Sequence, residues 1–204
     1  MTPDQIAAYF TRSDGDYVFA RWGRPIVPVV FGVEEATLGV VKGAIEAVVA
    51  LAGHSTAETD PELGANVMLF FFRDWAELLT IPKLDHLVPE LAPLCARLAQ
   101  ADANQYRLFR FDANGAIKAV FVFLRMDAYL ADMAAEDLAL AQAAQVICLW
   151  SDTAFAKVSP LGVVNGRTLL RPDVAAIIRA AYAPSLPAVA SDASHALRLA
   201  ARIE

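Results

Sequence analysis

The sequence predicts a single α+β domain in which a small mixed sheet with a β-hairpin packs against several helices. Segments with helical periodicity alternate with short, strongly apolar runs rich in β-branched and aromatic residues. The chain has 204 residues, enough for one sizeable hydrophobic core and few for two. We therefore expect one domain over 1–204, with an N-terminal helix and loop at 1–19 and a C-terminal helical tail at 188–204.

The first third of the chain predicts a helix, an edge strand and a longer helix. A short helix is expected at 2–10, and the segment RWGRPIVPVVFGV after the following loop indicates a strand. Pro25 and Pro28 have no N–H to donate to a β-ladder, so this strand is expected either at the edge of the sheet or to pair only at its end. The segment EEATLGVVKGAIEAVVALAGHS then has a period of about 3.6 residues, which predicts an amphipathic helix that ends near Gly53. Its apolar face comprises Leu38, Val41, Ile45, Val48 and Ala52.

The middle of the chain gives the clearest local signal, a hairpin. NVMLFFF predicts a buried strand, and the prolines that follow at 82, 89 and 93 predict short helices with irregular joins. The two β-rich halves of YRLFRFDANGAIKAVFVFLR flank the turn residues Asn114 and Gly115, which tolerate positive φ.

The last third predicts mainly helix. Asp127 is expected to cap a long helix that contains LALAQAAQVICLWSD. The segment SPLGVVNGRTLLRP is expected to form a loop before a helix from Asp173 to about Tyr182, and SDASHALRLAARIE predicts a final helix.

Charge and hydropathy exclude some classes of partner. The net charge is −6 and no block of Lys or Arg is present, so we expect no nucleic-acid partner. Although 57% of residues are hydrophobic, no window predicts a transmembrane segment. The first residues lack the basic and apolar regions of a signal peptide, which favours a cytoplasmic location, or export if a leader has been removed. The partner is expected to be an unknown protein or small molecule, and the oligomeric state is open.

The sequence carries no familiar catalytic or cofactor motif. His54, His86 and His195 are too far apart to form a ligand-spaced pair, so no metal site is expected. Cys95 and Cys148 lie in apolar, helix-like sequence and are expected to be buried thiols, with one disulfide between them as the alternative. The glycines form no GxGxxG or P-loop and no GxSxG is present, so we expect no cofactor and no catalytic residue.

Two sets of polar residues are candidates for a site. Asp132, Glu136 and Asp137 are expected mainly as the acidic first half of a helix, which the helix dipole favours. The alternative is that they hold a hard cation together with Asp152. In LALAQAAQVICLWSD, Gln142 and Gln145 share a helix face. They are expected either to bond to neighbouring backbone or to form the floor of a cleft. The candidate cleft comprises Gln142, Gln145, Trp150, Ser151 and Asp152. As an alternative, Asp152 caps the loop SDTAF.

The order of several segments resembles a proteobacterial domain family of unknown function, described as lipoproteins and grouped with zincin-like metallopeptidases. The segments are RWGRPIVPVVFG, GANVMLFF, FDANGAIKAVFVFL, LAQA, the SD after that helix, and RPDVAAIIRAAYAPSLP. Together they cover most of residues 20–190. The resemblance implies a zincin-like fold.

The resemblance also implies that the catalytic pair is missing. The family's His and general-base Glu correspond to Asp137 and Leu138, whereas Gln142 and Asp152 match. Since leucine can neither bind a metal nor transfer a proton, the resemblance implies a degenerate metallopeptidase with a vestigial cleft. The leading hypothesis is a non-catalytic, metal-free domain that binds a protein partner or small ligand. The alternatives are a carboxylate-based, metal-dependent hydrolase and a structural or assembly protein.

Overall fold

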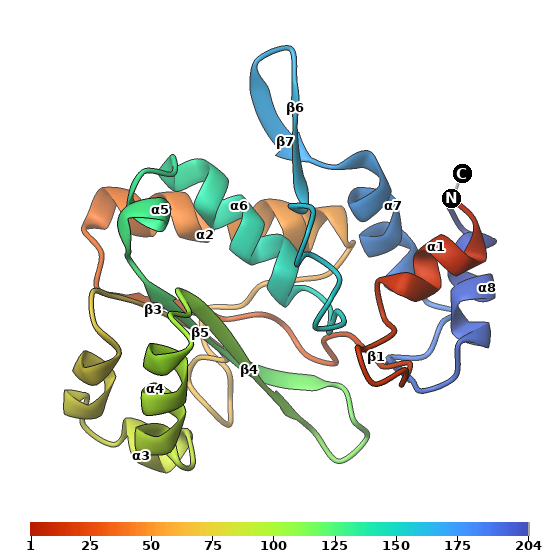
Figure 1. Cartoon of the computed structure of the whole chain (residues 1–204). Coiled ribbons are helices and arrows are strands. Elements are labelled where there is room, and N and C mark those ends of the chain that lie inside the picture. The colour runs from red at the N-terminus through yellow and green to blue at the C-terminus, as the bar shows by residue number, and fades with distance from the viewer. Residues whose placement is uncertain (204) are drawn as a thin grey trace.

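The computed structural model describes residues 1–203 and shows a mixed α+β fold, as predicted (Figure 1). The central sheet has the strand order β2 (Pro28–Phe31), β3 (Val67–Phe72), β5 (Ile117–Arg125), β4 (Gln105–Phe111). Strands β2, β3 and β5 are parallel, and β4 runs antiparallel to β5. The two edges of the sheet are therefore β2 and β4.

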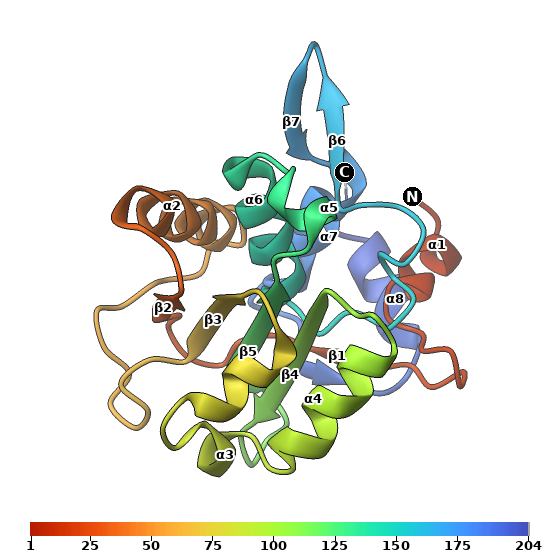
Figure 2. The ribbon, with the colours of Figure 1, turned by 60° about the vertical axis from the view of Figure 1, so that its left-hand side comes forward.

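Helices cover both faces of this sheet (Figure 2). Helices α2 (Glu35–Leu51) and α6 (Ala135–Val146) pack together on one face. The opposite face carries η1 (Trp75–Thr80), α3 (Leu84–Leu87) and α4 (Leu91–Gln100). Because successive side chains of a strand point to opposite faces, the sheet divides the hydrophobic core into two clusters.

Strand β5 shows this division directly. Val120 and Val122 belong to the cluster beneath α2 and α6, whereas Phe121 and Phe123 belong to the cluster beneath α4. All four side chains are buried, since β5 lies in the interior of the sheet with helices on both sides.

The N-terminal and C-terminal segments of the chain lie side by side. Strand β1 (Phe19–Ala20) pairs antiparallel with β8 (Val189–Ala190), and α1 (Pro3–Ala8) packs against α8 (Ser194–Ala200). Buried side chains of both helices join the larger core cluster, where they meet α7 (Pro172–Ala181). Within residues 188–203, the predicted C-terminal helical tail (188–204) therefore consists of a short strand followed by a helix.

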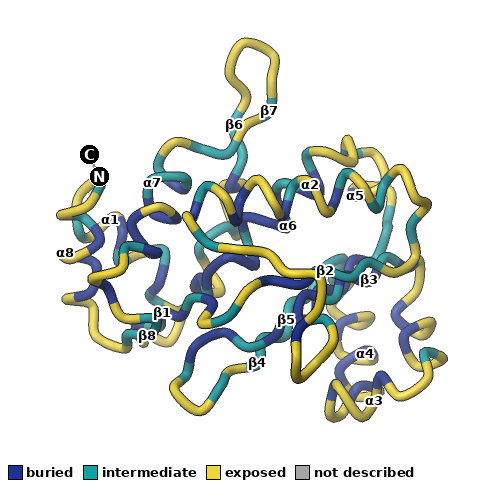
Figure 3. The backbone as a smooth tube through the Cα atoms, turned by 180° about the vertical axis from the view of Figure 1, so that it is seen from behind, coloured by how far each residue is buried: buried dark blue, intermediate teal, exposed yellow. Residues whose placement is uncertain are grey.

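A projecting hairpin replaces the loop expected before α7. It consists of β6 (Leu161–Val164) and β7 (Arg167–Leu170), joined by Asn165 and Gly166, both of which have positive φ. These values suit a tight two-residue hairpin turn, for which Asn-Gly is the preferred sequence. The hairpin extends away from the sheet, and most of its residues are exposed (Figure 3).

The long helix predicted after Asp127 is in fact two helices. Asp127 caps the short α5 (Ala128–Ala131) by accepting a hydrogen bond from the Leu130 N–H. Helix α6 then begins at Ala135 and ends at Val146. Cys148 consequently lies beyond the helix, where its backbone pairs with that of Arg21.

Several sequence predictions are confirmed. The proline-containing strand β2 lies at an edge, and β4 and β5 form the expected hairpin, in which Gly115 has a φ of 83°. Val41, Ile45 and Val48 of α2 are buried as its periodicity predicts. Helix α2 ends at Leu51, two residues before Gly53, whose φ of 65° is suited to the residue after the C-cap Ala52.

Cys95 and Cys148 are both buried and unpaired. They belong to different core clusters, on opposite faces of the sheet, so the alternative of a disulfide between them is wrong. No helix within residues 1–203 is both long and apolar enough to span a membrane.

Candidate functional site

A cavity of about 740 Å³ lies beside the edge strand β4. One wall is formed by β4 itself, and the other by the end of α6 and the segment 149–156 that follows it. Arg12 and Asp14, from the loop between α1 and β1, complete the lining. We call this space the β4 cavity. Its volume lies within the range of small-molecule sites, about 300–1,000 Å³.

Four of the five residues predicted to form a cleft line the β4 cavity: Gln145, Trp150, Ser151 and Asp152. The fifth, Gln142, lines an adjoining cavity of about 250 Å³, which shares Gln145 with the first. The structure thus places these five residues around neighbouring hollows.

Gln142 is buried and bonds to side chains of β4. Its Oε1 accepts a hydrogen bond of 2.5 Å from Nη2 of Arg107, and its Nε2 donates to Gln105 over 3.4 Å. Of the two alternatives that the sequence left for this amide, bonding to neighbouring backbone is therefore wrong for Gln142. Gln145 donates to the Ala141 carbonyl of its own helix, and is therefore a structural amide whose side chain also borders the cavity.

Arg107 is the charged group that the sequence analysis missed. Its Nη2 also donates to Oε1 of Gln105 at 2.7 Å, so both of its acceptors are neutral amides. Its Nε is enclosed and has no partner within residues 1–203. No carboxylate of the described chain lies within ion-pair distance of this guanidinium. Arg107 is thus a largely desolvated cation with no counter-ion.

The environment of Arg107 disfavours its charge but does not remove it. Burial lowers the pKa of the guanidinium from 12.5 to about 10, so the side chain is still protonated at neutral pH. The last nitrogen, Nη1, has no partner in residues 1–203 but is not among the enclosed atoms. Nη1 is therefore the part of this cation that a ligand can reach.

Aromatic packing holds the wall opposite β4. Trp150 stacks on Phe10 with ring centroids 5.2 Å apart, and its Nε1 donates to the Ala144 carbonyl at the end of α6. Tyr9 and Phe155 meet Trp150 edge-on at 5.8 and 5.2 Å. Arrangements of this kind fix ring positions beyond what burial alone provides. The cavity therefore has a rigid aromatic side facing the arginine.

Ser151 and Asp152 connect this wall to neighbouring loops. The Ser151 N–H donates to the Tyr9 carbonyl, and its hydroxyl shares a 3.1 Å hydrogen bond with Thr153. The Asp152 carboxylate accepts from the backbone N–H of Ser13 at 3.0 Å and from the Ser13 hydroxyl at 2.5 Å. These bonds from Ser13 lower the pKa of Asp152. Asp152 thus holds the loop between α1 and β1, whereas the alternative given for it was to cap the SDTAF loop.

The carboxylates proposed for a metal-dependent hydrolase do not converge. Asp132 and Glu136 are exposed, and Asp137 accepts a hydrogen bond from the Thr168 hydroxyl at 2.9 Å. None of the three lines the β4 cavity with Asp152. Over residues 1–203, no group of three or more His, Cys, Asp or Glu side chains has a metal-binding arrangement. The geometric requirement of that hypothesis is not met.

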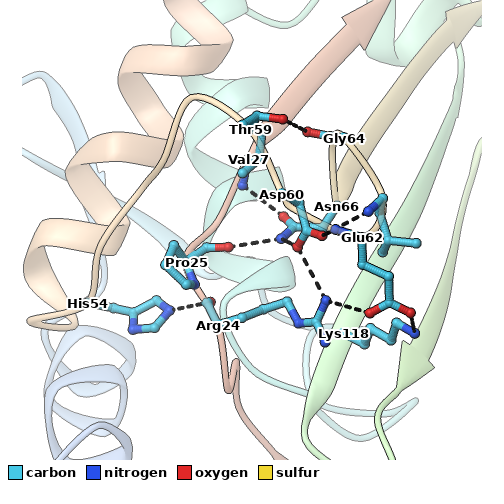
Figure 4. Close-up of polar contacts among 11 residues, drawn as sticks. Arg24, Pro25, Val27, His54, Thr59, Asp60, Glu62, Gly64, Asn66 and Lys118 are labelled. Atoms are coloured by element: carbon cyan, nitrogen blue, oxygen red, sulfur yellow. Dashed lines mark hydrogen bonds and ion pairs between the residues drawn. The ribbon is translucent and has the colours of Figure 1, made fainter.

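A second polar cluster lies at the end of the sheet where the parallel strands β2, β3 and β5 begin (Figure 4). Buried Asp60 accepts hydrogen bonds from the N–H groups of Glu62 and Leu63, and from the side chains of Asn66 and Arg24. Burial alone would raise the pKa of Asp60, but these hydrogen bonds outweigh it and lower the pKa to about 2.

Asn66 completes this cluster by joining it to the start of β2. Its side-chain oxygen Oδ1 accepts a hydrogen bond of 2.8 Å from the Val27 N–H, and its Nδ2 donates one of 2.9 Å to the Pro25 carbonyl. Lys118 pairs with Glu62 on the outside. Every polar atom of Asp60 and Asn66 has a partner, so the cluster is a structural link with no group left for a ligand.

The three histidines are separate. His86 is exposed, His54 bonds to the Arg24 carbonyl through Nε2, and buried His195 contacts the Tyr17 hydroxyl through Nδ1 at 2.9 Å. Burial lowers the pKa of His195 to about 4, so this side chain is neutral at physiological pH.

Comparison with known proteins gives no relative: no family model, curated protein or solved structure matches this chain. The predicted resemblance to the zincin-like family consequently stays a hypothesis. Leu138, which that resemblance aligns with a general base, is a buried core residue.

Proposed function

We propose that this chain is a non-catalytic binding domain whose β4 cavity accepts an anionic, carboxylate-bearing ligand. The observation that carries the proposal is the guanidinium of Arg107, which has only neutral acceptors and an accessible Nη1. Desolvating a cation without a counter-ion is unfavourable, so its retention beside a cavity is better explained by a ligand than by stability.

The rest of the lining agrees with binding rather than covalent chemistry. Aromatic side chains of Phe109, Trp150 and Phe155 offer apolar contact to the body of a ligand. The one hydroxyl nucleophile, Ser151, has no histidine in the lining to act as its base. If the zincin-like resemblance is correct, the cavity lies beside the helix that carries catalysis in that family, and the cleft has kept a binding role.

Thermal unfolding with a panel of ligands tests this proposal. Acetate, succinate, phenylacetate and inorganic phosphate are compared with phenylacetamide, which has the same apolar body as phenylacetate but no charge. We expect phenylacetate to raise Tm most, because it combines a carboxylate with an aromatic ring, and phenylacetamide to have no effect. A ligand at ten times its Kd stabilises the folded state by about 1.4 kcal/mol.

Two variants locate the effect. Arg107→Met removes the proposed anchor, whereas Arg110→Met removes an arginine of the same strand that bonds to the Leu87 carbonyl and does not line the cavity. The Arg110 variant should keep the ligand response and the Arg107 variant should lose it. An equal response in both variants, or a response to phenylacetamide equal to that of phenylacetate, would contradict the proposal.

A further inference from the structure

Strand β4 has an unpaired edge along the β4 cavity. The Arg125 N–H donates to the Asn104 carbonyl at 2.8 Å, which makes these residues a hydrogen-bonded pair. Such pairs alternate in an antiparallel ladder, so the backbone groups of Gln105, Arg107 and Phe109 point away from β5. Within residues 1–203, no backbone or side-chain group bonds to these N–H and C=O groups.

The same three residues contribute their side chains to the cavity. Gln105, Arg107 and Phe109 alternate with Tyr106 and Leu108, which pack against the cluster on the opposite face of the sheet. The open edge, the unpaired cation and the apolar ring of Phe109 therefore border one space. A strand of five residues spans about 17 Å, which suits a short extended segment.

From this arrangement we propose that the free edge of β4 binds an extended acidic peptide as an additional strand, a refinement that rests on the proposed anion-binding function. In such a pair, the peptide residue opposite Arg107 has its side chain on the same face, with Cβ atoms about 5 Å apart. An aspartate or glutamate there reaches the accessible Nη1. Two residues away, an apolar peptide side chain lies opposite Phe109. The recognised pattern is an acidic residue two positions from an apolar one.

Charge favours this occupant over a second copy of the chain. Strand β4 itself carries Arg107 and Arg110 and no acidic residue, so two β4 edges brought together would place like charges in one sheet. An acidic strand from another protein supplies the missing counter-charge and the missing backbone partners at once. Exposed edges of this kind are recognised binding sites for extended segments.

The test uses a heptapeptide blocked at both ends, with a central glutamate, valines two residues to each side of it and threonines elsewhere. This symmetry places the same side chains opposite β4 in either strand direction. Binding to the full chain is measured by calorimetry, and the amides of Gln105, Arg107 and Phe109 are followed by hydrogen exchange. We expect saturable binding and about tenfold slower exchange at these amides. Replacing the glutamate by glutamine should weaken binding about tenfold or more.

Two N-methylated peptides separate strand addition from anion binding. In an antiparallel pair the glutamate and valine nitrogens face β4, so methylating them should abolish binding, whereas methylating the threonine nitrogens, which face away, should not. In a parallel pair the residue opposite Arg107 faces away from β4, so the two methylated peptides exchange roles. If both methylated peptides bind equally and Arg107→Met abolishes both, anion binding stands and strand addition is wrong. If phenylacetate binds and no peptide does, the peptide proposal fails alone. Failure of all these ligands would overturn both proposals, and a dimer with protected β4 amides in light scattering and exchange would replace the peptide by a second copy.

Discussion

Replacing Arg107 and Gln142 together should stabilise the protein, although replacing Gln142 alone should destabilise it. Gln142→Leu removes the acceptor held at 2.5 Å and leaves the cation with Gln105 as its one partner. Hydrogen bonds to charged groups contribute about 1.5–3 kcal/mol, so we expect a loss of about 2 kcal/mol.

Arg107→Met has two opposing effects. Lowering the pKa from 12.5 to about 10 corresponds to about 3 kcal/mol between the charged and neutral forms, and we take about half because the side chain keeps some solvent contact. Against this gain, the buried Gln142 amide loses its partner, at a cost of about 1–3 kcal/mol. The single variant should therefore lie within about 1 kcal/mol of the wild type.

The double variant removes the charge and leaves no orphaned amide from this pair, so it should be more stable than the wild type by about 1 kcal/mol. The coupling between the two sites is then about 3 kcal/mol, at the upper end for contacting residues. Urea denaturation followed by tryptophan fluorescence gives all four free energies of unfolding, with Arg110→Met as a control expected within about 0.5 kcal/mol. If Arg107→Met loses more than about 3 kcal/mol and the double variant is no better than the sum of the singles, the cation is structural and our reasoning fails.

Three further predictions concern stability and local order. Because the pKa of Asp60 is lowered from 3.8 to about 2, its carboxylate should contribute about 2 kcal/mol to the free energy of unfolding above pH 4. This contribution should be lost as the pH falls from 3.8 to about 2. Asp60→Asn should flatten that part of a stability–pH curve, and an unchanged slope would count against the hydrogen-bond network of Asp60. Burial lowers the pKa of His195 from 6.5 to about 4, so as the pH falls the unfolded state binds the proton first. The free energy of unfolding should therefore decrease as the pH falls from 6.5 to about 4. This decrease should be absent in His195→Gln, and its persistence would assign it to another group. Asp152→Asn should speed exchange of the Ser13 amide about tenfold with no change at core amides, and an unaltered rate would show that this bond does not order the loop.

The parts of the fold that sequence predicted well depend on local chemistry. Pro25 and Pro28 exclude a central ladder position, and Asn114 with Gly115 suits a reversal of the chain, so β2 and the β4–β5 hairpin follow from a few residues. The β6–β7 hairpin was missed although Asn165 and Gly166 are the same kind of signal. Its strands have four residues each and project from the body, so no buried face produces a clear alternation.

The site was predicted only from its helical side. The amides and the Trp150–Asp152 segment stand out in sequence because they end an uncharged run. Arg107 does not, because an arginine in QYRLFRF looks like an ordinary exposed residue of an edge strand. Its partner Gln142 is 35 residues away, and their meeting depends on how α6 is placed over the β4–β5 register. The one available signal was the alternation that puts Gln105, Arg107 and Phe109 on the same face.

The pairing of β1 with β8 determines when this protein can finish folding during synthesis. Phe19 and Ala20 leave the ribosome first, yet their partners Val189 and Ala190 follow about 170 residues later, which is roughly 10–35 s at 5–20 residues per second. During that interval Ile6 and Phe10, fully buried in the folded chain, have no complete core to enter. A ribosome stalled before residue 189 therefore holds a chain with exposed apolar side chains at its N-terminal end, a substrate for chaperones rather than a partly working domain.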